Sequence, residues 1–246
     1  MNTTIQGAAE RLRDAKKVIA LTGAGASVES GIPDFRSPGG LWTTYPPEEY
    51  ATIDAFMANP DKVWKLWYEL GQSLHEKKPN AGHKSLATLE SLCPLEAIIT
   101  QNIDNLHQAA GSSQVIEYHG NARRIQCMDC KKVTPLPPTL TGPKAPRCPC
   151  GGLQKPDIVF FGELIPPDAM TRADALARTC DVVIVVGTSA QVFPAAGIPF
   201  IAREHGACII ECNLEATDFT KSITDFFLEG PSGTTLPALE QALRIP

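Results

Sequence analysis

The chain lacks the features that would place it in a membrane, outside the cell or on nucleic acid. Its longest apolar run, Val182–Val186, is far too short to cross a bilayer. The first 17 residues include Glu10 and Asp14 and no continuous apolar stretch, so we expect no secretory signal. Acidic residues outnumber basic ones by 27 to 22, and a net charge of −5 provides no strong basic field for nucleic acid. We therefore expect a cytoplasmic protein with no membrane partner and no sequence-specific nucleic-acid partner.

Disulfides are unexpected in the cytoplasm, so the eight cysteines need another interpretation. Four form a Cys-x2-Cys and a Cys-x-Cys pair separated by seventeen residues, which is the outline of a zinc ribbon. The second pair is shorter than usual, but Pro149 and Gly151-Gly152 supply a knuckle-like turn. The alternative is a set of four unligated buried thiols. We predict a structural Zn²⁺ whose coordination is closed by Cys127, Cys130, Cys148 and Cys150. The other cysteines lie in apolar surroundings and are expected to be buried: Cys93, Cys180, Cys208 and Cys212.

Short apolar segments alternate with helical patterns along most of the chain. The expected strands are 17–22, 95–100, 182–186, 207–212 and 223–228, and the expected helices are 1–16, 80–92, 167–178, 194–204 and 236–243. Continuously apolar strands that alternate with helices indicate a parallel sheet covered on both faces. We predict an α/β fold, a Rossmann-like doubly wound parallel sheet formed by 1–36, 80–122 and 158–246. Two inserts interrupt it: a helical one at 37–79, and a zinc-binding module at 123–157 that is too polar to fold on its own core.

A glycine-rich segment follows the first expected strand. Gly23-Ala24-Gly25 has the small residues of a phosphate-binding loop, and Ser27 offers a hydroxyl. The alternative is an ordinary tight turn between a strand and a helix. Because the third glycine of the usual dinucleotide motif is missing, a standard dehydrogenase site is not expected. The next residues suit a loop that folds over a ligand: Asp34, Phe35 and Arg36.

Polar residues also follow three other expected strands, where ligands bind in open α/β sheets. Gln101, Asn102 and Asp104 offer partners for a carboxamide, although Asp104 could equally cap a short helix. The segments Gly187-Thr188-Ser189 and Asn213-Leu214-Glu215 offer hydroxyls and a ribose-binding side chain, or are ordinary polar turns. His119, at the end of a further expected strand and followed by Gly120, is either structural or a general base near neutral pH.

Taken together, these motifs resemble the sirtuins, and the resemblance extends over essentially the whole chain. The matching segments are GAGASVESGIPDFRS (23–37), TQNIDNLH (100–107), YHG (118–120), the four clustered cysteines, PDIVFFGE (156–163), GTSAQVFPA (187–195) and ECNLE (211–215). In sirtuins a Rossmann-like domain and a small zinc-bearing domain flank a cleft. NAD and an acyl-lysine peptide meet in that cleft, so the resemblance implies NAD and Zn²⁺ as cofactors and acyl-lysine segments of proteins as partners.

The resemblance also implies a role for each motif. The NAD-binding set would be Gly23, Ala24, Gly25, Ser27, Asp34, Phe35, Arg36, Gln101, Asn102, Ile103, Asp104, Gly187, Thr188, Ser189, Asn213, Leu214, Glu215 and Ser232. His119 would be the catalytic base, and Asn102 and Asp104 would hold the nicotinamide. Two substrate-clamping strands, 159–163 and 191–193, would include Val159, Phe160, Phe161, Gly162, Glu163, Val192 and Phe193.

The resemblance implies deacylation with nicotinamide release. The acyl-lysine amide oxygen would attack the ribose carbon that bears nicotinamide, and His119 would deprotonate a ribose hydroxyl. The products would be free lysine, nicotinamide and O-acyl-ADP-ribose. Mono-ADP-ribosyl transfer to protein is the alternative activity. There are two further alternatives. A dinucleotide-dependent oxidoreductase is disfavoured by the missing third glycine, and a non-enzymatic NAD sensor is disfavoured by the intact His119.

The helical insert bears on the choice of acyl group. Its sequence resembles sirtuins that remove succinyl and malonyl groups, which carry a Tyr-x-x-Arg pair for the acyl carboxylate. Here that pair aligns with Trp67 and Leu70, and no arginine occurs between Ser37 and Ala122. A succinyl carboxylate would lose its water without gaining a cationic partner. Trp67 and Leu70 would instead form an apolar floor suited to acetyl or longer aliphatic chains. We therefore expect deacetylation, extending to longer fatty-acyl groups, with weak desuccinylation; a desuccinylase or demalonylase is the alternative function. Alternatively, both residues belong to the core of the insert.

Overall fold

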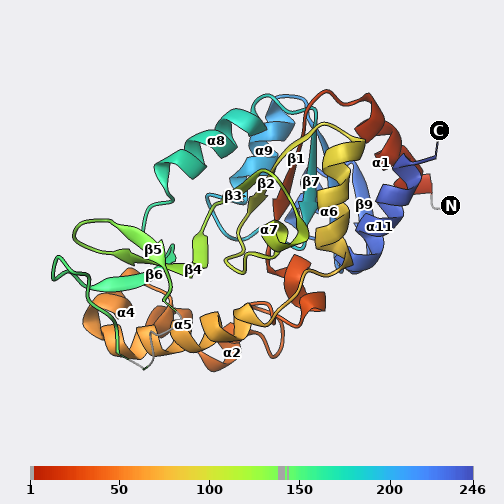
Figure 1. Ribbon diagram of the computed structural model, residues 1–246. Helices are drawn as coiled ribbons and strands as arrows, with labels where there is room; N and C mark the ends of the chain where they lie inside the picture. The colour runs from red at the N-terminus through yellow and green to blue at the C-terminus, as the bar shows by residue number, and fades with distance from the viewer. Residues whose placement is uncertain (1–2, 138–141, 143, 246) are drawn as a thin grey trace.

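Six parallel strands form the centre of the molecule (Figure 1). The computed structural model describes residues 3–137, 142 and 144–245. Residues 1–2 of the expected first helix, and 138–141 and 143 of the expected zinc module, lie outside the described residues. The strands are β1 (Val18–Thr22), β2 (Leu95–Thr100), β3 (Val115–Glu117), β7 (Val182–Val186), β8 (Cys208–Asn213) and β9 (Phe226–Glu229). Their spatial order is β3-β2-β1-β7-β8-β9, the order of a Rossmann-like sheet.

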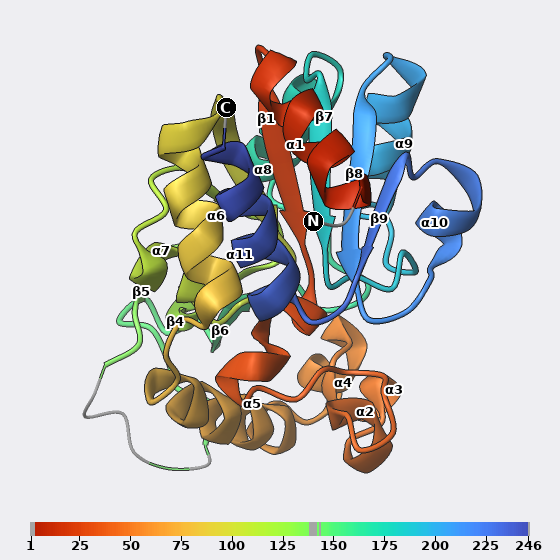
Figure 2. The same ribbon diagram turned by 90° about the vertical axis from the view of Figure 1, so that its right-hand side faces the viewer.

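Helices cover both faces of this sheet, as Figure 2 shows. Every residue of β1 is buried: Val18 and Ala20 pack toward one face, and Ile19 and Leu21 toward the other. The first face is covered by α1 (Thr3–Asp14), α6 (Ala81–Leu92) and α11 (Ser232–Leu243). The second is covered by α8 (Pro167–Ala177), α9 (Gly197–Glu204) and α10 (Asp218–Ser222). The predicted doubly wound α/β fold is confirmed.

Several expected boundaries are wrong by a few residues. The first helix ends at Asp14, α9 begins at Gly197 after a turn, and the last strand begins at Phe226. The last helix begins at Ser232, because the Glu29 carboxylate accepts the N–H of Gly233 in its first turn at 2.6 Å. Helix α10 was not expected, since it is too short to show periodicity and depends on a capping box at Thr217.

A second lobe combines a small sheet with the helical insert. The antiparallel strands β4 (Gly120–Cys127), β5 (Val133–Pro135) and β6 (Gln154–Ile158) are ordered β5-β4-β6. The insert contains α2 (Leu41–Thr44), α3 (Pro47–Tyr50), α4 (Ile53–Ala58) and α5 (Pro60–His75). Both parts contribute to one apolar core, which includes Phe56, Val63, Trp67, Ala122, Ile158 and Phe160. The small sheet therefore packs on the insert instead of standing alone.

Two short helices complete the described chain. The 3-10 helix η1 (Ala24–Ser30) follows β1, and α7 (Leu106–Ala110) follows the loop after β2. Among the described residues, no helix combines the length and the apolar character needed to span a bilayer.

Candidate active site

The loops after β1 and β7 meet where the strand order reverses, the position at which open α/β sheets bind ligands. Gly23 N–H donates to the Val186 carbonyl at 2.9 Å, and Gly25 N–H donates to the Gly187 carbonyl at 2.8 Å. A Cβ on Gly25 would lie 2.8 Å from the Gly187 Cα. The two glycines therefore allow the two loops to pack closely. Their N–H groups are directed at β7 and its loop, so Ala24 and Ser27 are the residues of this segment that face the neighbouring cavity.

Three buried polar residues form a hydrogen-bonded group beside this contact. The Ser27 hydroxyl donates to Asp104 Oδ2 at 2.7 Å and accepts from Asn102 Nδ2 at 3.1 Å. Asn102 Nδ2 also donates to the Gly23 carbonyl at 3.0 Å, so its carbonyl oxygen is the side-chain atom that can accept from a ligand. Asp104 Oδ1 accepts from Leu106 N–H at 2.9 Å. Asp104 thus belongs to the polar group and also binds the first turn of α7.

Two histidines extend this group away from the cavity. Asn80 caps α6 by accepting from His83 N–H, and His83 Nε2 approaches the Ser27 hydroxyl at 3.5 Å. Burial lowers the pKa of His83, against the raising effect of Asp104. The His107 ring lies 4.8 Å from the His83 ring and contacts Thr22 Oγ1 at 2.8 Å. The sequence offered no signal for the contact of His83 with Ser27 or of His107 with Thr22, because the partners are more than fifty residues apart.

His119 lies in the two-residue passage from β3 to β4, between the two sheets. Its Nδ1 is 3.2 Å from the Gln101 carbonyl, which can only accept, so Nδ1 carries the hydrogen and Nε2 is the basic atom. Burial lowers the pKa of His119, and the hydrogen bond to Gln101 opposes this effect. The neutral imidazole that a general base requires is therefore favoured at neutral pH.

A mostly apolar cavity adjoins the polar group. It encloses about 440 Å³, its open mouth included, and its lining includes Ser27, Asn102, Ile103, Asp104, Phe35 and Leu70. Asp34 shapes the loop above it, because Asp34 Oδ1 accepts from the N–H groups of Arg36 and Ser37 at 3.0 and 2.8 Å. The Phe35 ring packs 5.0 Å from the Trp42 ring, and Arg36 is exposed.

The other strand ends are linked to one another by hydrogen bonds. Gln101 Nε2 donates to Thr188 Oγ1 at 3.2 Å, and Asn213 Nδ2 donates to the Thr188 carbonyl at 2.9 Å. Ser189, Leu214 and Glu215 are exposed beside them. Ser232 is buried, and its hydroxyl donates to Glu29 Oε2 at 3.3 Å. The residues predicted from separate motifs therefore form one row along the carboxyl edge of the sheet.

The two expected substrate strands are not strands in the structure. Within residues 159–163 only an isolated bridge from Phe161 to Thr52 forms, and residues 191–193 are irregular. Phe161 and Phe193 are exposed, as a binding surface requires, with 45% and 68% of their area accessible. Phe160 is instead a core residue, with its ring 5.8 Å from those of Phe56 and Trp67. Gly162 is exposed, and Val159 and Val192 are half-buried.

Glu163 is fixed by a lysine that the sequence did not single out. The buried Lys155 ammonium lies 3.0 Å from Glu163 Oε2 and donates to the Ile158 carbonyl at 2.6 Å. Glu163 Oε2 also accepts from Phe160 N–H at 2.9 Å. The ion pair joins β6 of the small sheet to the turn that carries Phe161 and Gly162.

Trp67 and Leu70 both lie on α5 but have different surroundings. Trp67 is buried in the shared core, and its Nε1–H donates to the Tyr50 carbonyl at 2.7 Å. Leu70 is half-buried and lines the cavity with Phe35 and Ile103. Trp67 is thus a core residue, as one of the two interpretations held, whereas Leu70 reaches the cavity.

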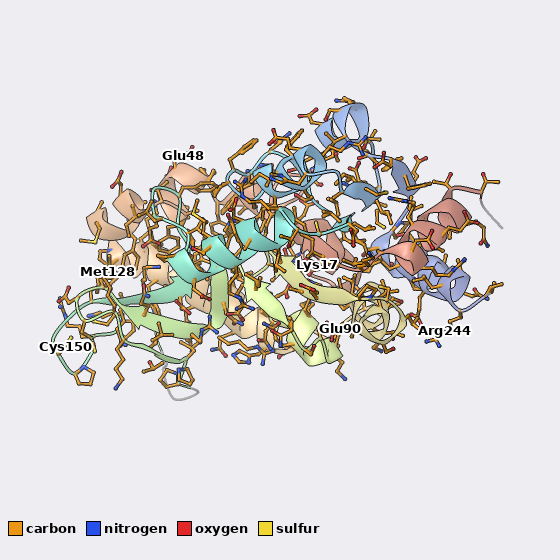
Figure 3. The ribbon with its side chains drawn as sticks, turned by 90° about the horizontal axis from the view of Figure 1, so that it is seen from above. Lys17, Glu48, Glu90, Met128, Cys150 and Arg244 are labelled. Atoms are coloured by element: carbon orange, nitrogen blue, oxygen red, sulfur yellow. The ribbon has the colours of Figure 1, made fainter. Side chains whose placement is uncertain are left out.

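The four clustered cysteines lie at the far end of the small lobe, where Figure 3 labels Cys150 and Met128. Their four sulfurs all lie within 4.8 Å of one another, with Cys127–Cys150 at 3.5 Å and Cys130–Cys148 at 3.8 Å. Sulfurs bound tetrahedrally to zinc at about 2.3 Å lie about 3.8 Å apart, so the donor set and its geometry fit Zn²⁺. A Cβ on Gly152 would lie 2.7 Å from the Cys127 sulfur, which explains the glycine in this turn. The other cysteines, Cys93, Cys180, Cys208 and Cys212, are buried.

Comparisons with known proteins agree with this geometry. The model of the Sir2 family matches residues 23–194. An NAD-dependent protein deacylase from Pyrococcus furiosus is 46% identical over 239 residues, covering 95% of this chain and 95% of that protein. The fold is similar to the structure of a Sir2 homolog–NAD complex, with a TM-score of 0.92, 41% identity and coverage of 97% of this chain and 93% of that one. It is also similar to a Sir2 structure with a deacetylated p53 peptide and 3′-O-acetyl ADP-ribose, with a TM-score of 0.89, 35% identity and coverage of 96% and 97%.

Proposed function

The chain belongs to the Sir2 family, and on that premise we propose that it is an NAD-dependent protein lysine deacylase that prefers acetyl groups. The observation that carries this proposal is a set of hydrogen bonds at the carboxyl edge of the sheet. They hold Asn102 and Asp104 beside Ser27, and they hold His119, after β3, on the carbonyl of Gln101, the residue before Asn102. Acyl-lysine segments of proteins are the proposed substrates, and the net charge of −5 suits lysine-rich segments. We also expect action in the cytoplasm, with neither membrane nor nucleic acid as partner.

The residues present fit NAD. A row of hydroxyl, amide and carboxylate groups runs along the carboxyl edge of β1, β2, β7 and β8, ending at Asn213 and Glu215 for the adenosine half. Thr188 and Ser189 offer hydroxyls to ribose or phosphate, and Ser232 lies where α11 begins. At the nicotinamide end, the Asn102 carbonyl oxygen can accept from a carboxamide, and Ile103 and Phe35 provide an apolar wall.

Each residue has a defined task in the proposed reaction. Bound NAD supplies an electrophilic ribose carbon, a nicotinamide leaving group and the hydroxyl that receives the acyl group. Asn102 orients the carboxamide, while Ser27 and Leu106 N–H keep Asp104 fixed beside it. His119 Nε2 removes the hydroxyl proton, and the Gln101 carbonyl holds the ring in the required tautomer. Phe35 covers the cavity and excludes water.

The acyl preference follows from the wall of this cavity. Leu70 is an apolar lining residue, and the described lining contains no lysine or arginine. A terminal carboxylate would therefore be desolvated without a cation, at a cost of several kcal/mol. Acetyl and longer aliphatic groups carry no such charge, so we infer that they are preferred over succinyl and malonyl groups.

A panel of acyl-lysine peptides assayed with and without NAD tests the function. We expect turnover of the acetyl peptide only when NAD is present, with one nicotinamide released per lysine freed. NAD-independent turnover, or no turnover of any acyl peptide, would contradict the proposal. A succinyl kcat/KM equal to or above the acetyl value would refute the acyl preference alone.

A further inference from the structure

Arg124, in β4, links β3, the strand that ends just before His119, to β6, the strand that pairs with β4. Its Nη2 lies 2.5 Å from Glu117 Oε2, at the end of β3, and its Nε lies 2.7 Å from Asp157 Oδ2, in β6. Both carboxylates are mostly buried, with 18% of each side chain exposed. Asn121 and Gln108 also donate to Glu117 Oε1, so the carboxylate accepts from three side chains. One guanidinium therefore joins the large sheet to the small sheet.

The position of these contacts along the chain relates them to the catalytic base. Glu117 lies two residues before His119, and Asp157 lies two residues before Val159, whose N–H donates to the His119 carbonyl at 3.0 Å. Gly120, next to His119, has φ +82°, and a Cβ there would lie 2.1 Å from the Asp157 carbonyl. The backbone at His119 is thus confined between β6 and the end of β3, and Arg124 holds these two segments together.

We propose that Arg124, through Glu117 and Asp157, is a positioning residue for His119. The proposal rests on the function given above, because it assigns His119 as the base. Arg124 is not a catalytic residue, since it is bound to two carboxylates and His119 is held by Gln101 and Val159. Its task is to keep the imidazole at a fixed place and depth between the two sheets.

The environment of the imidazole makes this role measurable. The His119 ring contacts the Gln101 carbonyl and, edge-on, the Tyr118 ring. The charged groups on β3, β4 and β6 are Glu117, Arg123, Arg124, Lys155 and Asp157. Burial, not the charge of these groups, lowers the pKa of His119. A loosened passage would admit water and return the pKa toward the ordinary value of about 6.5. The base acts in its neutral form. When the solution is acidified, the variant would therefore lose activity at a higher pH than the wild type does.

The test compares Arg124→Met with Arg203→Met. Arg203 is a matched control, because it also joins two segments through a carboxylate, with Nη1 3.0 and 2.8 Å from the oxygens of Asp225. The exposed fraction of the Arg203 side chain is 44%, close to the 36% of Arg124, and Arg203 lies away from His119. The pH profile of kcat/KM on an acetyl peptide, the plateau kcat and the KM for NAD are measured for both variants, with thermal unfolding as a check of folding.

For Arg124→Met we expect a plateau kcat lowered about tenfold, an acidic limb shifted to higher pH and a nearly unchanged KM for NAD. Arg203→Met should keep the wild-type kcat and acidic limb even if it unfolds at lower temperature. A plateau kcat within twofold of wild type, with the acidic limb unmoved, would overturn the proposal, and so would equal effects of the two variants.

If Arg124→Met does not fold, Arg124→Lys and Asp157→Asn take its place under the same criteria. Failure of the proposed function would appear as absent turnover in the wild type, which distinguishes the two.

Discussion

At the scale of single residues, the proposed chemistry depends on groups held by contacts between distant parts of the chain. Ser27 of η1 is bound to Asn102 and Asp104 after β2, and His119 after β3 is bound to Gln101. Each of these side chains is thereby restricted before any ligand is bound. Such pre-organisation is what makes a general base or an amide partner effective, because the reacting groups need not be reoriented.

The role of His119 is tested by His119→Ala. We expect deacetylation to fall by about 10²- to 10⁴-fold, the typical contribution of a general base. NAD affinity, measured by calorimetry, should remain close to that of the wild type, because the imidazole acts on cofactor that other residues bind. A variant that keeps a substantial share of wild-type turnover would show that another group is the base.

The acyl pocket is tested by Leu70→Arg, alone and together with Trp67→Tyr. Leu70 lines the cavity, so an arginine there should raise the succinyl kcat/KM about tenfold, the size of one charge-assisted hydrogen bond. The second change removes a buried N–H that donates to Tyr50, so the double variant should be less stable than Leu70→Arg. Leu70→Met is the matched control and should leave the ratio of acetyl to succinyl activity unchanged. No gain in succinyl activity from either arginine variant would mean that the pocket is placed incorrectly.

At the scale of secondary-structure elements, the loops that follow β1 and β7 are in direct backbone contact at the site. Gly25 and Gly187 approach each other so closely that the backbone leaves no room for a methyl group. This contact sets the direction in which η1 leaves the sheet and therefore the position of Ser27. The glycine pattern thus supports the site mainly through packing between loops.

Gly25→Ala should separate these two loops. We expect a loss of about 1–3 kcal/mol in the free energy of unfolding, as for other overpacked sites, and a raised KM for NAD. Gly197→Ala is the control, because its nearest neighbouring atom would lie 4.0 Å from the new methyl group. It should be neutral or slightly stabilising in α9. Unchanged stability and NAD KM in Gly25→Ala would show that the loops can separate without cost.

The small sheet is the element that should depend on metal. We expect one zinc per chain in the purified protein, and Cys150→Ala should lose the metal, unfold β4–β6 and lower activity indirectly. Cys93→Ala, which changes a buried cysteine of the large domain, should retain the zinc. Metal analysis by mass spectrometry measures both variants. A zinc-free wild type, or an unchanged zinc affinity in Cys150→Ala, would contradict the four-cysteine site.

At the scale of the whole molecule, local patterns predicted the sheet well because its central strands are short, apolar and buried on both faces. Val182–Val186 could be recognised from its composition alone, and the four cysteines from their spacing. Contacts between segments far apart in the sequence could not be predicted. Lys155 and Arg124 have no distinguishing local sequence, yet they fix the segments that carry Glu163 and His119. The shared core of the helical insert and the small sheet was also not evident, because each part contributes only a few of its apolar residues.

The two lobes together form the place where the proposed substrates would meet. The cavity lies between residues that follow strands of the large sheet, Phe35 of the loop after η1, and Leu41 and Leu70 of the helical insert. The exposed side chains of Phe161 and Phe193 come from the segment after the small sheet and from the loop after β7. Both lobes therefore contribute to the cavity and to the exposed aromatic surface beside it. Acyl transfer to NAD requires that the arrangement of the two lobes be maintained.

The central claim is tested most directly by the masses of the products formed from an acetyl-lysine peptide and NAD. The account predicts a deacetylated peptide, nicotinamide and acetyl-ADP-ribose in equal amounts, with no ADP-ribose attached to peptide or protein. A peptide or protein that gains the mass of ADP-ribose while the acetyl group stays on lysine would contradict it, and would identify the enzyme as an ADP-ribosyltransferase.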